Sequence, residues 1–219
     1  MVSLAREGGR YAVGLADGSR LESEAVVMAT PAHASAEILR DFDPALSRVL
    51  SEIPYPPVSV VCLGYRKERL GKSLDGFGFL VPFREKRRIL GTLWDSSIFP
   101  NRAPEGYVLL RTMLGGARAA EIASLEESRA AGVVIEELEE IMGIRVAPDF
   151  VRVYFHEKAI PQYVLGHQER LGKIDEALTR HKGLSLSGNA YRGISVNDCI
   201  ENSYRLAEEI VSGTKNKSA

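Results

Sequence analysis

The stretch Leu184-Ser185-Leu186-Ser187-Gly188-Asn189-Ala190-Tyr191-Arg192-Gly193-Ile194-Ser195-Val196-Asn197-Asp198-Cys199 does most to decide the fold. Its first four residues alternate apolar and polar side chains, which predicts a short strand. Gly188 and Gly193 then allow the backbone to approach a ligand without hindrance from a Cβ atom. A strand followed by a glycine-flanked turn is common, so the turn alone does not identify a ligand.

A helix is predicted after this turn. We expect Asn197 to cap it and the helix to run from Asp198 to about Ser212, with Gly213 as its stop. The N-terminus of such a helix offers free amides and the positive end of a dipole to an electron-rich group. The stretch therefore predicts a strand, a ligand-facing turn and a helix.

Composition excludes several classes of function. The chain has 219 residues, of which 45% are hydrophobic and 26% charged, and its formal net charge is -1. This charge gives no reason to expect nucleic acid as a partner. No apolar run is long enough to span a membrane, the four histidines have no metal-ligand spacing, and Cys62 and Cys199 lie in apolar runs. We expect a cytoplasmic protein with reduced cysteines and no metal site.

The N-terminal part predicts a hairpin followed by helices. Arg10–Leu15 and Leu21–Ala29 alternate around the turn Asp17-Gly18. Pro31 then starts one helix, and a second runs from Pro44 to about Glu52. The cluster Pro54-Tyr55-Pro56-Pro57 forms the first boundary between domains.

The middle of the chain predicts one sheet covered by a helix. The strands expected in it are Val58–Tyr65, Gly78–Val81, Arg88–Asp95, Tyr107–Leu114 and Val151–Phe155. The helix is Glu126–Met142, and its glutamates Glu136, Glu137, Glu139 and Glu140 are interpreted as a solvated face. A further helix, Gln168–His181, leads back to the C-terminal strand.

This order predicts an α+β or α/β fold in which residues 54–156, a mixed-sheet domain, are inserted between residues 1–53 and 157–219 of another domain.

Four blocks of the sequence carry a family resemblance. They are Gly76–Pro82, Phe99–Gly106, Ala159–His167 and Gly188–Cys199. In this order they resemble the protoporphyrinogen oxidase family, whose members are flavoenzymes of the amine-oxidase-like superfamily. The resemblance covers most of the chain and implies that the inserted domain binds substrate and that the flanking segments belong to a Rossmann-like FAD-binding domain.

The family's activity is what the resemblance implies for this chain: FAD-dependent oxidation of protoporphyrinogen IX to protoporphyrin IX in haem biosynthesis, with oxygen as the acceptor. Oxidation of coproporphyrinogen III to coproporphyrin III is an alternative within the enzyme class, and carotenoid desaturases and amine oxidases are more distant ones. A non-catalytic porphyrin-binding module that has lost the flavin is an alternative of another class. Peripheral membrane contact and a homodimer stay open.

One motif of such enzymes is missing from the sequence. A G-x-G-x-x-G turn between a strand and a helix holds the dinucleotide pyrophosphate in them, and these 219 residues contain none. The chain therefore resembles the C-terminal half of an oxidase. We expect a truncated or a split enzyme that needs an N-terminal FAD-binding half and that alone binds FAD weakly or not at all and is inactive.

The resemblance also implies site residues. Phe77, Gly78, Leu80 and Met113 would line the substrate pocket. Residues near the cofactor would be Ala29, Thr30, Pro31, Tyr163, His167, Gly188, Gly193, Ile194, Ser195, Val196 and Asn197, with the amides of Gly193–Asn197 facing the flavin. No side chain is assigned as catalytic, because most of the reactivity belongs to the cofactor.

Overall fold

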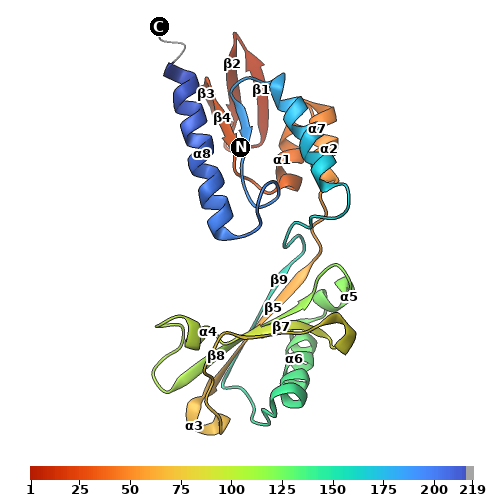
Figure 1. Cartoon of the computed structure of the whole chain (residues 1–219), viewed down its shortest axis with the longest axis vertical. Coiled ribbons are helices and arrows are strands. Elements are labelled where there is room, and N and C mark those ends of the chain that lie inside the picture. The colour runs from red at the N-terminus through yellow and green to blue at the C-terminus, as the bar shows by residue number, and fades with distance from the viewer. Residues whose placement is uncertain (216–219) are drawn as a thin grey trace. The chain divides into compact units, whose positions relative to one another are not determined.

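The computed structural model describes residues 1–215 and divides into two compact units (Figure 1). The first unit joins Met1–Pro54 to the segment that begins at Pro161, and the second is Tyr55–Ile160. The fold is a mixture of helices and several sheets, as predicted.

An antiparallel sheet opens the first unit. Its strands are β1 (Ser3–Glu7), β2 (Arg10–Gly14) and β3 (Arg20–Ser23), in that order. The prediction that Leu21–Ala29 forms one strand is wrong, because the Ser23 hydroxyl donates a hydrogen bond to the carbonyl of Ala25 at 2.6 Å and turns the chain. The residues that follow this turn form a separate strand.

That strand, β4 (Val26–Met28), pairs in parallel with β10 (Leu184–Leu186). Val26 lies opposite Leu184 and Met28 opposite Leu186, so both strands end at the same edge. The amide of Ser187 extends the pairing by donating to the carbonyl of Met28 at 3.0 Å. The residues that follow β4 and those that follow β10 therefore lie at the same edge of the sheet, although almost 160 residues separate the two strands in the sequence.

Four helices complete the first unit: α1 (Ala32–Leu39), α2 (Pro44–Ser51), α7 (His167–Thr179) and α8 (Val196–Lys215). In the view of Figure 1, α8 lies on one side of strands β1–β4, and α1, α2 and α7 lie together on the other.

The predicted ends of α8 are wrong. Its cap is Ser195, whose hydroxyl accepts a hydrogen bond from the amide of Asp198 at 3.1 Å, so Asn197 lies inside the first turn. The helix also continues through Gly213 to Lys215, since a single glycine weakens a helix without terminating it.

The second unit is built on a five-stranded sheet in the order β6-β7-β8-β5-β9. Its strands are β5 (Val58–Arg66), β6 (Gly78–Leu80), β7 (Ile89–Leu93), β8 (Tyr107–Gly115) and β9 (Phe150–His156). We expected a mixed sheet, but every pairing between these strands is antiparallel.

A long helix, α6 (Glu127–Met142), packs on one face of this sheet (Figure 1). Val134 and Leu138 of the helix share a core with Val61, Leu63 and Leu110 of the sheet. The short elements α3 (Lys67–Leu70), η1 (Phe83–Glu85), α4 (Asp95–Ile98) and α5 (Ala120–Ala123) lie in the connections. Within residues 1–215, no helix combines the length and apolar character needed to cross a membrane.

The interpretation of Glu137 as part of a solvated face is wrong. Its side chain is only 3% exposed, and its carboxylate accepts a hydrogen bond from Nε of Arg88 at 3.0 Å. The guanidinium of Arg88 also binds Glu136. These pairs fasten the connection before β7 to α6.

Candidate functional site

A groove lies where β4 and β10 end, along α8. It has a volume of about 650 Å³ and is lined by Ala29, Gly188, Asn189, Ile194, Val196, Cys199, Ile200, Ser203, Tyr204 and Ala207. Open α/β sheets bind ligands beyond the carboxyl ends of their parallel strands. The fold therefore brings the predicted residue Ala29 together with the predicted residues Gly188, Ile194 and Val196.

The walls of this groove are mostly apolar and reach solvent. Val196, Ile200 and Tyr204 are 76%, 51% and 71% exposed, which is unusual for large apolar side chains on one helix. A flat, apolar ring would remove this surface from water. Sequence reasoning missed Ile200 and Tyr204, although their spacing of four residues places them on one face of a helix.

Thr30 and Pro31, which follow Ala29 and are also predicted to lie near the cofactor, have structural partners. The hydroxyl of Thr30 lies 2.8 Å from that of Ser35, and the carbonyl of Pro31 accepts a hydrogen bond from the amide of Ser35. Both contacts stabilise the start of α1. A direct contact between these residues and a cofactor stays a prediction.

Gly193 is required by the geometry of the turn. Its φ angle is 105°, and a Cβ atom at this position would lie 2.3 Å from Cβ of Asp198. Any side chain would therefore clash and strain the backbone. The close approach places Asp198 at the start of α8, where its carboxylate accepts a hydrogen bond from the amide of Ser195 at 3.1 Å.

The amides available to a ligand are fewer than the sequence predicts. The amide of Gly193 donates to the hydroxyl of Tyr163, and that of Ser195 donates to Asp198. Hydrogen bonds from the side chain and backbone of Ser195 lower the pKa of Asp198. Among residues 1–215, the amides of Val196 and Asn197 have no acceptor in the chain, as expected for the first turn of a helix. Val196 lines the groove and Asn197 follows it in the first turn of α8, so both amides lie at the end of the helix that borders the groove.

The side chains of Tyr163 and His167 contact the segment between β10 and α8. Their rings stack with centroids 4.0 Å apart and an interplanar angle of 13°. His167 is 5% exposed, whereas Tyr163 is 42% exposed. Their hydrogen bonds go to the turn itself, and a direct contact with a cofactor stays a prediction.

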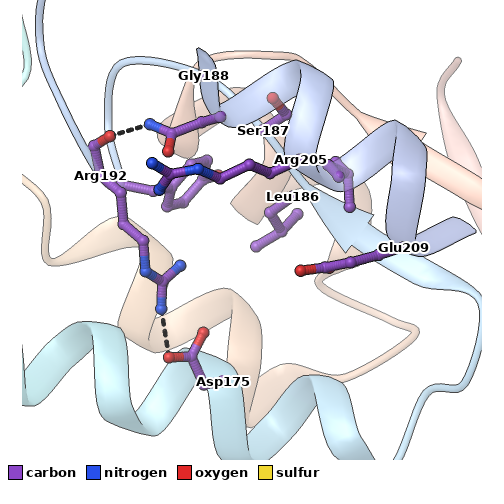
Figure 2. Close-up of a pocket in the computed structure, with 10 residues that line it drawn as sticks. Asp175, Leu186, Ser187, Gly188, Arg192, Arg205 and Glu209 are labelled. Atoms are coloured by element: carbon purple, nitrogen blue, oxygen red, sulfur yellow. Dashed lines mark hydrogen bonds and ion pairs between the residues drawn. The ribbon is translucent and has the colours of Figure 1, made fainter. Parts of the chain in front are cut away.

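A second groove, of about 410 Å³, lies between α7, β10 and α8 (Figure 2). It is polar: the guanidinium of Arg192 pairs with Asp175, and Arg205 and Glu209 extend from α8 along its wall. Asn202 donates a hydrogen bond to the carbonyl of Arg192. No sequence signal predicted this groove, because its charges come from α7, from α8 and from the loop before α8, which are separate in the sequence.

In the second unit, three of the predicted substrate residues share one face of the sheet. Phe79 packs against the core under α6, so its neighbours Gly78 and Leu80 face the opposite way. Met113 lies on that face too, since the buried residues Thr112 and Leu114 flank it on β8. We call this surface, formed by Gly78, Leu80, Leu93, Arg111 and Met113, the open face.

Sequence reasoning missed Leu93 and Arg111 on the open face. Strand register pairs Leu93 with both Gly78 and Arg111, and Nε of Arg111 lies 3.0 Å from Asp95, which is 6% exposed. The fourth predicted residue, Phe77, precedes β6 and is 74% exposed.

Gly78 itself is confined by its neighbour strand. Its φ angle is 120°, and an added Cβ would lie 2.0 Å from the carbonyl oxygen of Thr92. Only glycine fits at this position. The residue at this position therefore has no side chain to cover its backbone.

Comparisons with known proteins agree with this geometry. A family model described as flavin containing amine oxidoreductase matches residues 1–211. A chloroplastic protoporphyrinogen oxidase from Nicotiana tabacum is 38% identical over 200 residues, covering 87% of this chain and 36% of the relative. Coproporphyrinogen III oxidase from Bacillus subtilis is 29% identical over 202 residues, covering 92% of this chain and 43% of the relative.

Among solved structures, one from Exiguobacterium sp. 255-15, provisionally named protoporphyrinogen oxidase, superimposes with a TM-score of 0.79 at 23% identity. The match covers 95% of this chain and 45% of that one. The likeness shows a common fold. The chain spans less than half the length of each of these three proteins.

Proposed function

The chain belongs to the family of flavin-containing amine oxidoreductases, and from this premise we propose that it forms the substrate-binding unit and the C-terminal part of the FAD-binding unit of a protoporphyrinogen oxidase. The proposed reaction converts protoporphyrinogen IX to protoporphyrin IX, with oxygen as the acceptor. The 38% identity with the tobacco relative supports this substrate.

The observation that carries the proposal is the groove at the ends of β4 and β10. Ala29, Ile194 and Val196 would contact the flavin ring, and the amides of Val196 and Asn197 would bind its polar edge. A flavin, when bound, would accept hydride equivalents from the methylene bridges of the substrate. The protein's own contribution is to orient the two rings and to exclude water.

The open face of the second unit is the proposed substrate surface. A porphyrinogen is a large, mostly apolar macrocycle, and Leu80, Leu93 and Met113 offer apolar side chains beside the uncovered backbone of Gly78. The adjacent Arg111 is already paired with Asp95, so its charge contributes less to the recognition of substrate.

FAD binding by the chain alone is proposed to be weak or absent. The 219 residues contain no G-x-G-x-x-G turn, which in such folds supplies most contacts to the dinucleotide phosphates. These contacts would come from residues outside this sequence, in cis or on a second polypeptide.

Coproporphyrinogen III is a second candidate substrate, favoured by the match to the Bacillus subtilis enzyme. The two substrates share the macrocycle and differ in their peripheral groups. The open face recognises the shared part.

The test is to combine the chain with the N-terminal part of the tobacco relative and to follow porphyrin fluorescence with each porphyrinogen and FAD. We expect faster oxidation of protoporphyrinogen, and loss of activity in Met113→Glu on the open face. Val151→Glu is the matched control, because Val151 is an exposed apolar residue on the other face of the same sheet. Faster oxidation of coproporphyrinogen would favour the second candidate. Porphyrin binding without oxidation would favour a binding module.

A further inference from the structure

Tyr163 holds both ends of the loop that connects β10 to α8. Its hydroxyl donates a hydrogen bond to the carbonyl of Asn189 at 2.8 Å and accepts one from the amide of Gly193 at 3.0 Å. One phenol thus fixes the start and the end of the loop, which we call the turn loop (residues 188–193). A phenylalanine would lose both hydrogen bonds and keep the ring.

His167 holds the middle of the turn loop. Its Nε2 atom lies 3.2 Å from the carbonyl oxygen of Tyr191. A carbonyl oxygen only accepts hydrogen bonds, so Nε2 carries the hydrogen. The imidazole is buried and stacks on Tyr163, which orients the phenol in turn.

The turn loop needs such restraints because of its glycines. Gly188 and Gly193 have φ angles of 130° and 105°. Glycine reaches such angles easily, but it reaches many other backbone conformations just as easily. Each alternative conformation raises the entropic cost of ordering the loop. Three hydrogen bonds from two side chains select one conformation.

The segment that carries Tyr163 is itself anchored. The amide of Gln162 donates to the carbonyl of Pro54 at 2.9 Å, and the amide of His167 donates to the carbonyl of Val164 at 3.0 Å at the start of α7. The phenol is therefore held on a fixed backbone.

We propose that Tyr163 and His167 are positioning residues for the cofactor: they set the turn loop and thereby aim the amides of Val196 and Asn197 into the groove. This inference rests on the proposed function, since it assigns the amides to a flavin. It differs from the expectation that Tyr163 and His167 themselves lie near the cofactor.

The first test uses the chain alone and amide hydrogen exchange at Gly193, measured by NMR. Tyr163→Phe is expected to raise the exchange rate about tenfold, the effect of losing one or two hydrogen bonds. Tyr11→Phe is the matched control, because it removes a tyrosine hydroxyl bond of 2.9 Å to the carbonyl of Lys182 in the same unit, outside the turn loop. An unchanged rate at Gly193 in Tyr163→Phe would overturn the proposal.

The second test measures FAD affinity in the protein reconstituted with the N-terminal part of the tobacco relative. Tyr163→Phe and His167→Phe are expected to weaken FAD binding, whereas Tyr11→Phe is not. Faster exchange at Gly193 with unaltered FAD affinity would overturn the positioning role. If the reconstituted wild-type protein retains no flavin, the proposed function fails, and the exchange rates still decide whether Tyr163 fixes the loop.

Discussion

The Nε2 atom of His181 lies 2.7 Å from Oδ2 of Asp43, although 138 residues separate them in the sequence. The same carboxylate caps α2, because its Oδ1 accepts a hydrogen bond from the amide of Leu46 at 2.9 Å. The ring of Phe42 lies against His181, with centroids 4.7 Å apart. Asp43 therefore joins the start of α2 to the residues that follow α7, and it binds the two halves of the first unit.

Acid should weaken this connection. Burial alone would raise the pKa of Asp43, but hydrogen bonds from Leu46, His181 and Arg180 outweigh it and lower the pKa below its ordinary value. The stabilisation is therefore present above about pH 4 and is lost as the pH falls through the lowered pKa. Urea unfolding followed by circular dichroism should show a loss on the order of 1 kcal/mol.

Asp43→Asn is the control for this pH dependence. Asparagine keeps an oxygen that can cap α2 but carries no charge. The variant should be less stable than the wild type at neutral pH and should approach it in acid. Equal pH dependence of both proteins would contradict the role of Asp43.

Gly193→Ala should disrupt the turn loop. The positive φ angle and the clash with Asp198 are expected to cost about 1 to 3 kcal/mol of local stability. Gly172→Ala on α7 is the matched control: an added Cβ meets nothing within 4 Å there, and alanine favours a helix by up to about 1 kcal/mol. Thermal unfolding and exchange of the loop amides measure both. Wild-type exchange in Gly193→Ala would be inconsistent with the turn geometry.

Gly78→Ala should separate β6 from β7. The new methyl group would collide with the backbone of Thr92, which side-chain rotation cannot relieve. We expect faster exchange at the β6 and β7 amides and a loss of about 1 to 3 kcal/mol. Gly132→Ala, on α6 of the same unit, should be neutral or slightly stabilising. Equal stability of the two variants would argue against the register of β6.

Glu137→Gln should destabilise the second unit by about 1 to 2 kcal/mol. Breaking a fully buried ion pair costs more free energy than this. The Arg88 side chain is 40% exposed, so water screens part of its interaction with Glu137 and the expected cost is smaller. Glu139→Gln on the same helix is the control, because its contact with Arg145 lies in solvent and should matter by less than about 0.5 kcal/mol. Denaturant unfolding, followed through Trp94 fluorescence, compares the two. Similar losses in both variants would mean that Glu137 is not a buried anchor.

The sequence predicted an element well where the hydrophobic periodicity agrees with glycine or proline residues at its ends. The helix Glu126–Met142 and the strand Val58–Tyr65 match α6 and β5 to within a residue, because long periodic runs and flanking glycine or proline leave few alternatives. The end of α8 was missed because a single glycine weakens a helix without terminating it.

Pairing between distant segments was harder to predict. Nothing in Val26–Met28 indicates that it leaves the hairpin for β10, and the buried state of Glu137 depends on Arg88 from another element. The convergence of Ala29 with Ile194 and Val196 could be expected only from the family resemblance. Leu93 could be placed on the open face only once the strand register was known.

The most direct test of the central claim is flavin retention. The chain is mixed with the N-terminal part of the tobacco relative and FAD, passed through gel filtration, and its flavin absorbance is measured. We predict that the mixture retains flavin, that the chain alone retains little or none, and that Ala29→Trp in the groove abolishes retention while Ala16→Trp, on an exposed turn, does not. A folded mixture that retains no flavin, or one in which Ala29→Trp binds FAD as tightly as the wild type, would contradict the account.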